Sequence, residues 1–215
     1  MQVRPHATQT TGPDEPLAAL DAPTRQRLRG ELRRLLKEAA VPSLLVTHDR
    51  TDALVLGDDL VVMNEGCLMQ QGPVHEVFSR PANLAVAGIV AVETVQPARV
   101  LERGDLATVA VGEQRLLALA VDLPSNAKDV YVCIRAEDVI LIKGEPVRSS
   151  PRNCLTAVVR GLSPEGPMVR IDLDCSFPLS ALLTRQACEE LDLKAGERVL
   201  ALVKAPNVHL IPRTV

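Results

Sequence analysis

The sequence predicts an α/β segment followed by an all-β region built from two similar modules. Residues 13–90 combine an amphipathic helical pattern with one apolar run of the length of a buried strand. From about residue 95, segments rich in Val, Leu and Ile alternate with Gly, Pro, Asn and Asp, which is typical of all-β domains. This second region also repeats: residues 130–142 align without gaps on residues 199–211, an offset of 69.

The composition is that of a globular protein without nucleic-acid-binding character. The 215 residues are 47% apolar and 24% charged, with a net charge of −3 and only three aromatic side chains. A chain of this charge lacks the basic surface that neutralises phosphates and the rings that stack on bases, so we exclude nucleic acid as a partner. No apolar run approaches the length of a membrane span, and the N-terminus has no apolar signal core, so we expect a cytoplasmic protein. Five cysteines without a CxxC pair predict reduced thiols and no metal site.

The first segment begins with a polar, aperiodic stretch over residues 1–12, which we expect to be a disordered leader. The spacing of apolar residues then predicts a helix over 22–39, with Asp21 as its N-cap and Pro23 in its first turn. Because acidic residues interrupt its cationic face, we expect that face to be solvated. The cationic residues are Arg25, Arg27, Arg29, Arg33, Arg34 and Lys37.

Three further elements are predicted after this helix. Residues 43–47 form a short apolar run after Pro42, typical of a buried parallel strand, with His48 just past its end. Residues 60–64 and 67–71 flank Glu65-Gly66 and predict a hairpin, followed by a short helix over 73–78.

The all-β region is predicted to hold two five-stranded modules of the OB type, over residues 91–146 and 150–213. Each copy has the size of a small barrel, and comparable segments start at Ala98 and Ala157. Residues 146–151 (PVRSSP) read as a linker between the two modules.

Asp14-Glu15, Ala19-Leu20-Asp21 and His48 follow one another in an order that resembles the ATPase subunit of an ABC importer. Residues 13–90 then correspond to the C-terminal fragment of its P-loop ATPase domain, with a Walker B pair, a D-loop and a switch histidine. By this resemblance Asp14 would hold Mg²⁺, Glu15 would polarise the attacking water and His48 would sense the γ-phosphate. Phosphoryl transfer needs groups of these kinds.

The chain departs from that family in its phosphate-binding motifs. It contains no GxxxxGK[ST] loop and no LSGGQ-like signature, so phosphates lack a cradle. We therefore expect Asp14, Glu15 and His48 to be idle in this chain alone, which needs no cofactor of its own. ATP and Mg²⁺ would bind only if another polypeptide supplied the missing half.

A second constellation opens the second β-module. It comprises SPRN over residues 150–153, LTRQA over 183–187, EELDLKAG over 189–196 and KAPNV over 204–208. This order resembles the Mop domain, a TOBE-type module of molbindins and of molybdate-importer ATPases that binds molybdate or tungstate. A tetrahedral dianion suits several convergent donors and one or two cations. By the resemblance, the anion-binding residues are Ser150, Arg152, Asn153, Thr184, Lys204 and Ala205.

The first module resembles the same family less closely. Glu93-Thr94 stand where Arg152-Asn153 stand in the second module, and Arg135 replaces Lys204. A negative charge beside a pocket for a dianion is unfavourable. We therefore expect this copy to be mainly a structural partner, with Arg135 available to a shared pocket.

Three functions are compatible with these motifs. The favoured one is the oxyanion-binding regulatory portion of a molybdate importer ATPase, a homodimer that meets a membrane permease at the inner membrane. The second is a stand-alone oxyanion-binding or storage protein, and the third is a docking module of a sugar, polyamine or sulfate importer. Molybdate and tungstate are nearly isosteric and sulfate shares their charge, so the sequence leaves the ligand open.

Overall fold

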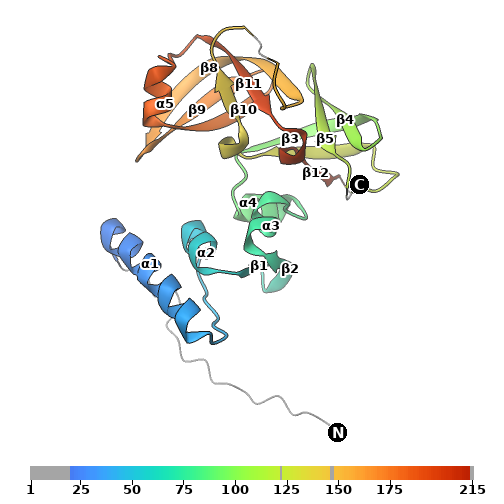
Figure 1. The fold of residues 1–215 in the computed structure, drawn as a ribbon. Coiled ribbons are helices and arrows are strands. Elements are labelled where there is room, and N and C mark those ends of the chain that lie inside the picture. The colour runs from blue at the N-terminus through green and yellow to red at the C-terminus, as the bar shows by residue number, and fades with distance from the viewer. Residues whose placement is uncertain (1–19, 122, 146–147, 214–215) are drawn as a thin grey trace. The chain divides into compact units, whose positions relative to one another are not determined.

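The computed structural model describes residues 20–121, 123–145 and 148–213 (Figure 1). The chain divides into two compact units, the first containing the residues up to Val61 with Gln71–His75, and the second Val62–Gln70 with the residues from Glu76 on. The predicted leader and the pair Asp14-Glu15 lie outside the described residues.

The first unit contains two helices, α1 (Ala22–Ala39) and α2 (Arg50–Leu56). The predicted first helix is confirmed, since α1 begins after Asp21, whose side chain accepts a hydrogen bond from the Thr24 N–H at 3.3 Å. It ends at Ala40 in the left-handed conformation, with φ at 49°.

The predicted strand over residues 43–47 is wrong. These residues form no regular element, and the side chains of Leu44 and Val46 are 77% and 56% exposed. A parallel strand needs a neighbour that takes up its backbone hydrogen bonds and covers its apolar side chains. Within the described ranges, no strand lies beside this segment.

The predicted hairpin and short helix are confirmed. Strands β1 (Asp59–Asn64) and β2 (Cys67–Pro73) form a two-stranded sheet, and α3 (Val74–Ser79) follows. The turn residues Glu65 and Gly66 have φ values of 49° and 76°, the two positive values that a type I′ hairpin turn requires. A further helix, α4 (Leu84–Ile89), was not predicted.

The rest of the second unit is mostly β and contains two five-stranded sheets. One has the order β12-β6-β3-β4-β5 and the other β10-β9-β8-β11-β7. The strands of the first are β3 (Thr94–Glu102), β4 (Leu106–Val111), β5 (Gln114–Leu119), β6 (Asp129–Ile134) and β12 (His209–Pro212). Those of the second are β7 (Ile140–Ile142), β8 (Asn153–Glu165), β9 (Met168–Asp174), β10 (Pro178–Thr184) and β11 (Arg198–Val203). Three short helical segments complete the unit: η1 (Ala136–Asp138), α5 (Arg185–Glu190) and η2 (Ala205–Asn207).

The internal repeat is confirmed, but the two copies exchange their last strands. The series β6-η1-β7 recurs as β11-η2-β12. Strand β7 of the first copy pairs with β11 of the second, and β12 of the second copy pairs with β6 of the first. In Figure 1, the dark red β12 therefore lies in the sheet of the green strands. Each sheet is complete only with a strand from the other copy.

Both sheets contribute to one apolar core. Its fully buried members include Val109, Leu116, Val132 and Ile134 from the first sheet and Val159, Ile171, Leu179 and Ala201 from the second. Burial of apolar surface stabilises by about 25 cal/mol per Å². The shared core therefore stabilises the two copies together.

Two of the five cysteines lie deep enough in this fold for their chemistry to change. Burial raises the pKa of the Cys133 thiol to about 12, and burial raises that of Cys175 to about 11. Both stay protonated at neutral pH and are poor nucleophiles. In the part of the chain that the structure describes, no helix is both long and apolar enough to cross a bilayer.

Candidate functional site

His48 lies in the exposed turn that precedes α2. Two neighbours fix the turn, because the Asp49 N–H donates to the Thr47 hydroxyl oxygen at 3.0 Å. Asp49 also caps α2, its Oδ1 accepting hydrogen bonds from the N–H groups of Thr51 (2.7 Å) and Asp52 (3.1 Å). The histidine is thus held at a defined place by its chain neighbours.

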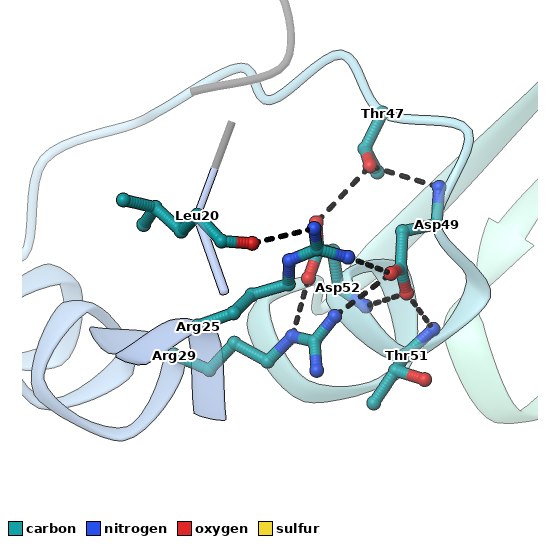
Figure 2. Close-up of polar contacts among 7 residues, drawn as sticks. All are labelled: Leu20, Arg25, Arg29, Thr47, Asp49, Thr51 and Asp52. Carbon is teal, nitrogen blue, oxygen red and sulfur yellow. Dashed lines mark hydrogen bonds and ion pairs between the residues drawn. The ribbon is translucent and has the colours of Figure 1, made fainter. Parts of the chain in front are cut away.

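The cationic face of α1, predicted to be solvated, in part contacts Asp49 and Asp52 at the start of α2 (Figure 2). Arg29 Nη2 lies 2.9 Å from Asp49 Oδ2, and Arg25 Nη1 lies 3.4 Å from the same oxygen. Farther along the helix, Arg33 Nη2 pairs with Asp58 Oδ1 at 2.7 Å. The sequence-based view was wrong here because the acidic partners lie 20 or more residues away along the chain.

Asp52 is the most buried member of this network, at 5% exposure. Its carboxylate accepts hydrogen bonds from Arg29 Nε and from the Thr47 hydroxyl, the latter at 3.3 Å. Burial acts to raise the pKa of Asp49, but the amides of Asp52 and Thr51 and the guanidinium of Arg29 outweigh it, so that this pKa is lowered. The lowered pKa keeps Asp49 ionised at neutral pH, and its ion pairs with Arg25 and Arg29 tie α1 to the turn that carries His48.

In the second unit, Asn153 is the first residue of β8 and is 3% exposed. Its Oδ1 accepts a hydrogen bond from the Leu117 N–H at 2.6 Å, while its Nδ2 donates to the carbonyls of Leu117 (2.9 Å) and Val203 (3.1 Å). Both amide protons are thus engaged by backbone oxygens. The structure gives this side chain the role of joining β5, β8 and β11.

Four other predicted residues, Ser150, Arg152, Lys204 and Ala205, lie at or beyond the end of the β8–β11 ladder that Asn153 closes. Val203 pairs with Asn153 at the end of the β11–β8 ladder, so Lys204 and Arg152 follow at the same end of the sheet. Both of these cationic side chains are exposed, as is Ser150, whereas Ala205 is buried in η2. Two exposed cations thus follow the buried Asn153 amide at one end of the β8–β11 ladder.

Thr184 is not brought to this cluster within one chain. It ends β10, where it pairs with Met168, and Met168 pairs in turn with Glu165 at the other end of β8 from Asn153. Its hydroxyl caps α5 by accepting a hydrogen bond from the Ala187 N–H at 3.2 Å.

Sequence reasoning missed the contribution of β5, whose residue Leu117 holds the Asn153 amide. The only signal in the sequence was the repeat itself, because strand pairing between copies follows from no local pattern. Arg135, expected to be available to a shared pocket, lines a hollow together with Asp138 of its own copy and Pro206 and Asn207 of the other. It is 7% exposed, and its guanidinium donates to the carbonyls of Phe78 (2.9 and 3.0 Å) and Val90 (3.2 Å).

The chain is similar to known proteins both in its C-terminal part and over most of its length. Residues 149–210 match the family model of the TOBE domain. This part of the chain is a TOBE domain. The chain is 35% identical over 205 residues to the molybdate/tungstate import ATP-binding protein WtpC of Pyrococcus horikoshii, covering 93% of this chain and 55% of that protein. It is 38% identical over 203 residues to the sulfate/thiosulfate import ATP-binding protein CysA 2 of Chromobacterium violaceum, covering 93% and 53%.

A solved structure of the cytoplasmic molybdate-binding protein ModG, with molybdate bound, resembles the fold with a TM-score of 0.51. It is 26% identical and covers 57% of this chain and 98% of its own. The resemblance to molybdate-type importer ATPases and to the Mop domain is confirmed by these matches. The chain spans about half the length of the curated relatives it matches.

Arg29→Ala is expected to loosen α1, because it leaves the buried Asp52 carboxylate without its cation. The free energy of opening of α1 amides should fall by about 1.5–3 kcal/mol, measured by native-state hydrogen exchange. Arg34→Ala is the matched control, since its pair with Glu38 is exposed and worth about 0.3–0.5 kcal/mol. Equal effects of the two substitutions would contradict a special role for Arg29.

Asn153→Ala is expected to destabilise the β region by roughly 3 kcal/mol, because three hydrogen bonds are lost in a buried position. Denaturant unfolding followed by circular dichroism measures this change. Cys154→Ala serves as the control, since the neighbouring side chain is exposed. A loss for Asn153→Ala no greater than for the control would show that the amide does not join the strands.

Proposed function

We propose that the TOBE domain and the β-module before it bind a tetrahedral oxyanion of the molybdate or tungstate type. The observation that carries the proposal is that Arg152 and Lys204 are both exposed and follow the last pair of the β8–β11 ladder, Asn153 and Val203, at the same end. Cations held beside a fixed backbone attract a dianion without a metal ion. The relative with bound molybdate and the relatives named for molybdate and tungstate import support this ligand class.

In this proposal Arg152 and Lys204 contact the ligand, whereas Asn153 holds the strands together. Both protons of its amide are engaged, so Asn153 acts by holding β8 and β11 in register. Arg152, Lys204 and Ser150 then supply charge and donors, together with the backbone of Ala205. Thr184, at the other end of β8, would reach the same anion only from a second copy of the chain. We therefore infer a homodimer.

We further propose that residues 13–90 derive from the P-loop ATPase domain of an ABC importer subunit and that residues 91–146 and 150–213 are two Mop-type modules. The resemblance to import ATP-binding proteins over 93% of the chain supports this origin. The whole protein would then work at the cytoplasmic side of a membrane permease, with the oxyanion acting on the importer through the β region. The exposed run that contains Leu44 and Val46 fits an origin in a larger sheet.

The chain by itself is expected to hydrolyse no ATP above background, because its sequence has no loop to hold the phosphates. A phosphate-release assay with Mg²⁺ measures this. Hydrolysis that is lost on His48→Ala would contradict the proposal that an additional half is required.

Lys204→Ala is expected to weaken molybdate binding roughly 10- to 150-fold, the equivalent of about 1.5–3 kcal/mol for a hydrogen bond to a charged group. Isothermal titration with molybdate, tungstate, sulfate and phosphate in turn gives the affinity and the ligand preference. Lys194→Ala is the matched control, an exposed lysine of the same module whose Nζ pairs with Asp192 Oδ2 at 2.9 Å.

Three outcomes of the titration would change the proposal. Sulfate bound more tightly than molybdate would favour the specificity named for CysA 2. Equal affinities of the Lys204 and Lys194 variants would remove Lys204 from the site. A folded wild-type chain that binds none of the four anions would leave the modules as docking elements.

A further inference from the structure

The two copies of the repeat place corresponding residues at the end of one strand ladder in each sheet. Thr94 pairs with Ile134 in β3–β6, and Asn153 pairs with Val203 in β8–β11. Positions 134 and 203 are separated by 69 residues, the offset of the repeat. Thr94 and Asn153 therefore correspond.

The side chains of Thr94 and Asn153 also make corresponding hydrogen bonds. The Thr94 hydroxyl accepts a hydrogen bond from the Ser180 N–H of the other sheet at 3.1 Å, as Asn153 Oδ1 accepts one from the Leu117 N–H. Both Thr94 and Asn153 are buried. The correspondence is thus one of contacts as well as of sequence.

The residues on either side of this pair differ in charge between the copies. Glu93 precedes Thr94 where Arg152 precedes Asn153, and Ala136 corresponds to Ala205 through the same offset of 69. In the first copy, Glu93 Oε2 accepts a hydrogen bond from the Ala136 N–H at 3.2 Å. The Glu93 carboxylate therefore occupies the Ala136 N–H. The corresponding N–H of the second copy, that of Ala205, belongs to the proposed anion site.

A cation also faces this carboxylate. Arg170 Nη1 lies 3.8 Å from Glu93 Oε1, while its Nε and Nη2 form two parallel hydrogen bonds to Glu165 at 2.6 and 3.0 Å. The side chain of Glu93 is 16% exposed, so the contact is largely shielded from solvent. An amide N–H and a guanidinium are the donors that an oxyanion uses.

We propose that Glu93 is a built-in carboxylate that keeps the first copy of the oxyanion site closed, so that only the second copy takes up an oxyanion. This inference rests on the proposed function and adds the number of oxyanions that each chain binds. A tethered carboxylate is present at an effective concentration of about millimolar or more, so it outcompetes a dilute free anion for the same donors. Its charge also repels a second anion.

The experiment is equilibrium dialysis of the full chain against molybdate, with bound molybdenum measured per chain. Glu93→Ala is expected to bind one molybdate more per chain than the wild type. The added site should be weaker, because Arg135, the counterpart of Lys204, is buried and donates to Phe78 and Val90. In an NMR titration, the Ala136 amide signal should shift with molybdate in Glu93→Ala and stay in place in the wild type.

Glu165→Ala is the matched control, since it removes the other carboxylate on Arg170 and leaves the Ala136 amide occupied. It is expected to bind as the wild type does. Glu93→Gln keeps an acceptor for that amide without the charge and has nearly the same shape, so it tests the inference if the alanine variant does not fold. It is expected to gain a second site weaker than that of Glu93→Ala.

The outcomes separate this inference from the proposed function. An unchanged stoichiometry in both folded Glu93 variants overturns the inference, and so does a wild type that already fills both copies. A wild type that binds no molybdate overturns the proposed function. In that case, a site gained only by the Glu93 variants would still support the closure of the first copy.

Discussion

The two copies of the repeat exchange their edge strands, β7 and β12. Each sheet therefore takes four strands from one copy and its fifth strand from the other. An edge strand leaves backbone donors and acceptors open, and here each copy covers the edge of the other. The same reciprocity recurs in side chains: Asn207 Nδ2 donates to Asp138 Oδ1 at 2.5 Å, and these two positions correspond in the repeat. The copies are therefore one folding unit, and their junction is held from both sides.

The sequence predicted the elements whose cause is local. Asp21 marks the start of α1, Glu65-Gly66 supplies the positive φ values of the hairpin turn, and the repeat locates β6-η1-β7 and β11-η2-β12. It did not predict which strand pairs with which, because both pairings satisfy the same apolar alternation. From the sequence, we also predicted that the arginines of α1 form a solvated face and that residues 43–47 form a strand, and both predictions were wrong. For the strand pairing and the arginines, the missing information was a partner distant in sequence. For residues 43–47, the described part of the chain holds no strand to pair with them.

The candidate site shows the same division between local and distant information. The resemblance of the motifs grouped Arg152, Asn153 and Lys204, and the register of β8 and β11 puts them at one end of the sheet. The role of Asn153 could not be predicted, because it depends on Leu117 in the other copy. The buried Asn153 amide fixes the backbone from which the neighbouring side chains extend.

The two copies of the repeat carry opposite charges at corresponding positions, so they are not equivalent toward an anion. Both copies present a buried polar residue and an alanine amide, but the preceding residue is Glu93 in one and Arg152 in the other. In the first copy the carboxylate meets its donors within the chain, so that end is already neutralised. In the second copy, the exposed cations Arg152 and Lys204 stand at one end of the ladder, where the proposed function places the oxyanion. Because Asn153 ties that end to β5, an anion bound there would, by the proposed function, stabilise the arrangement in which the two copies are joined.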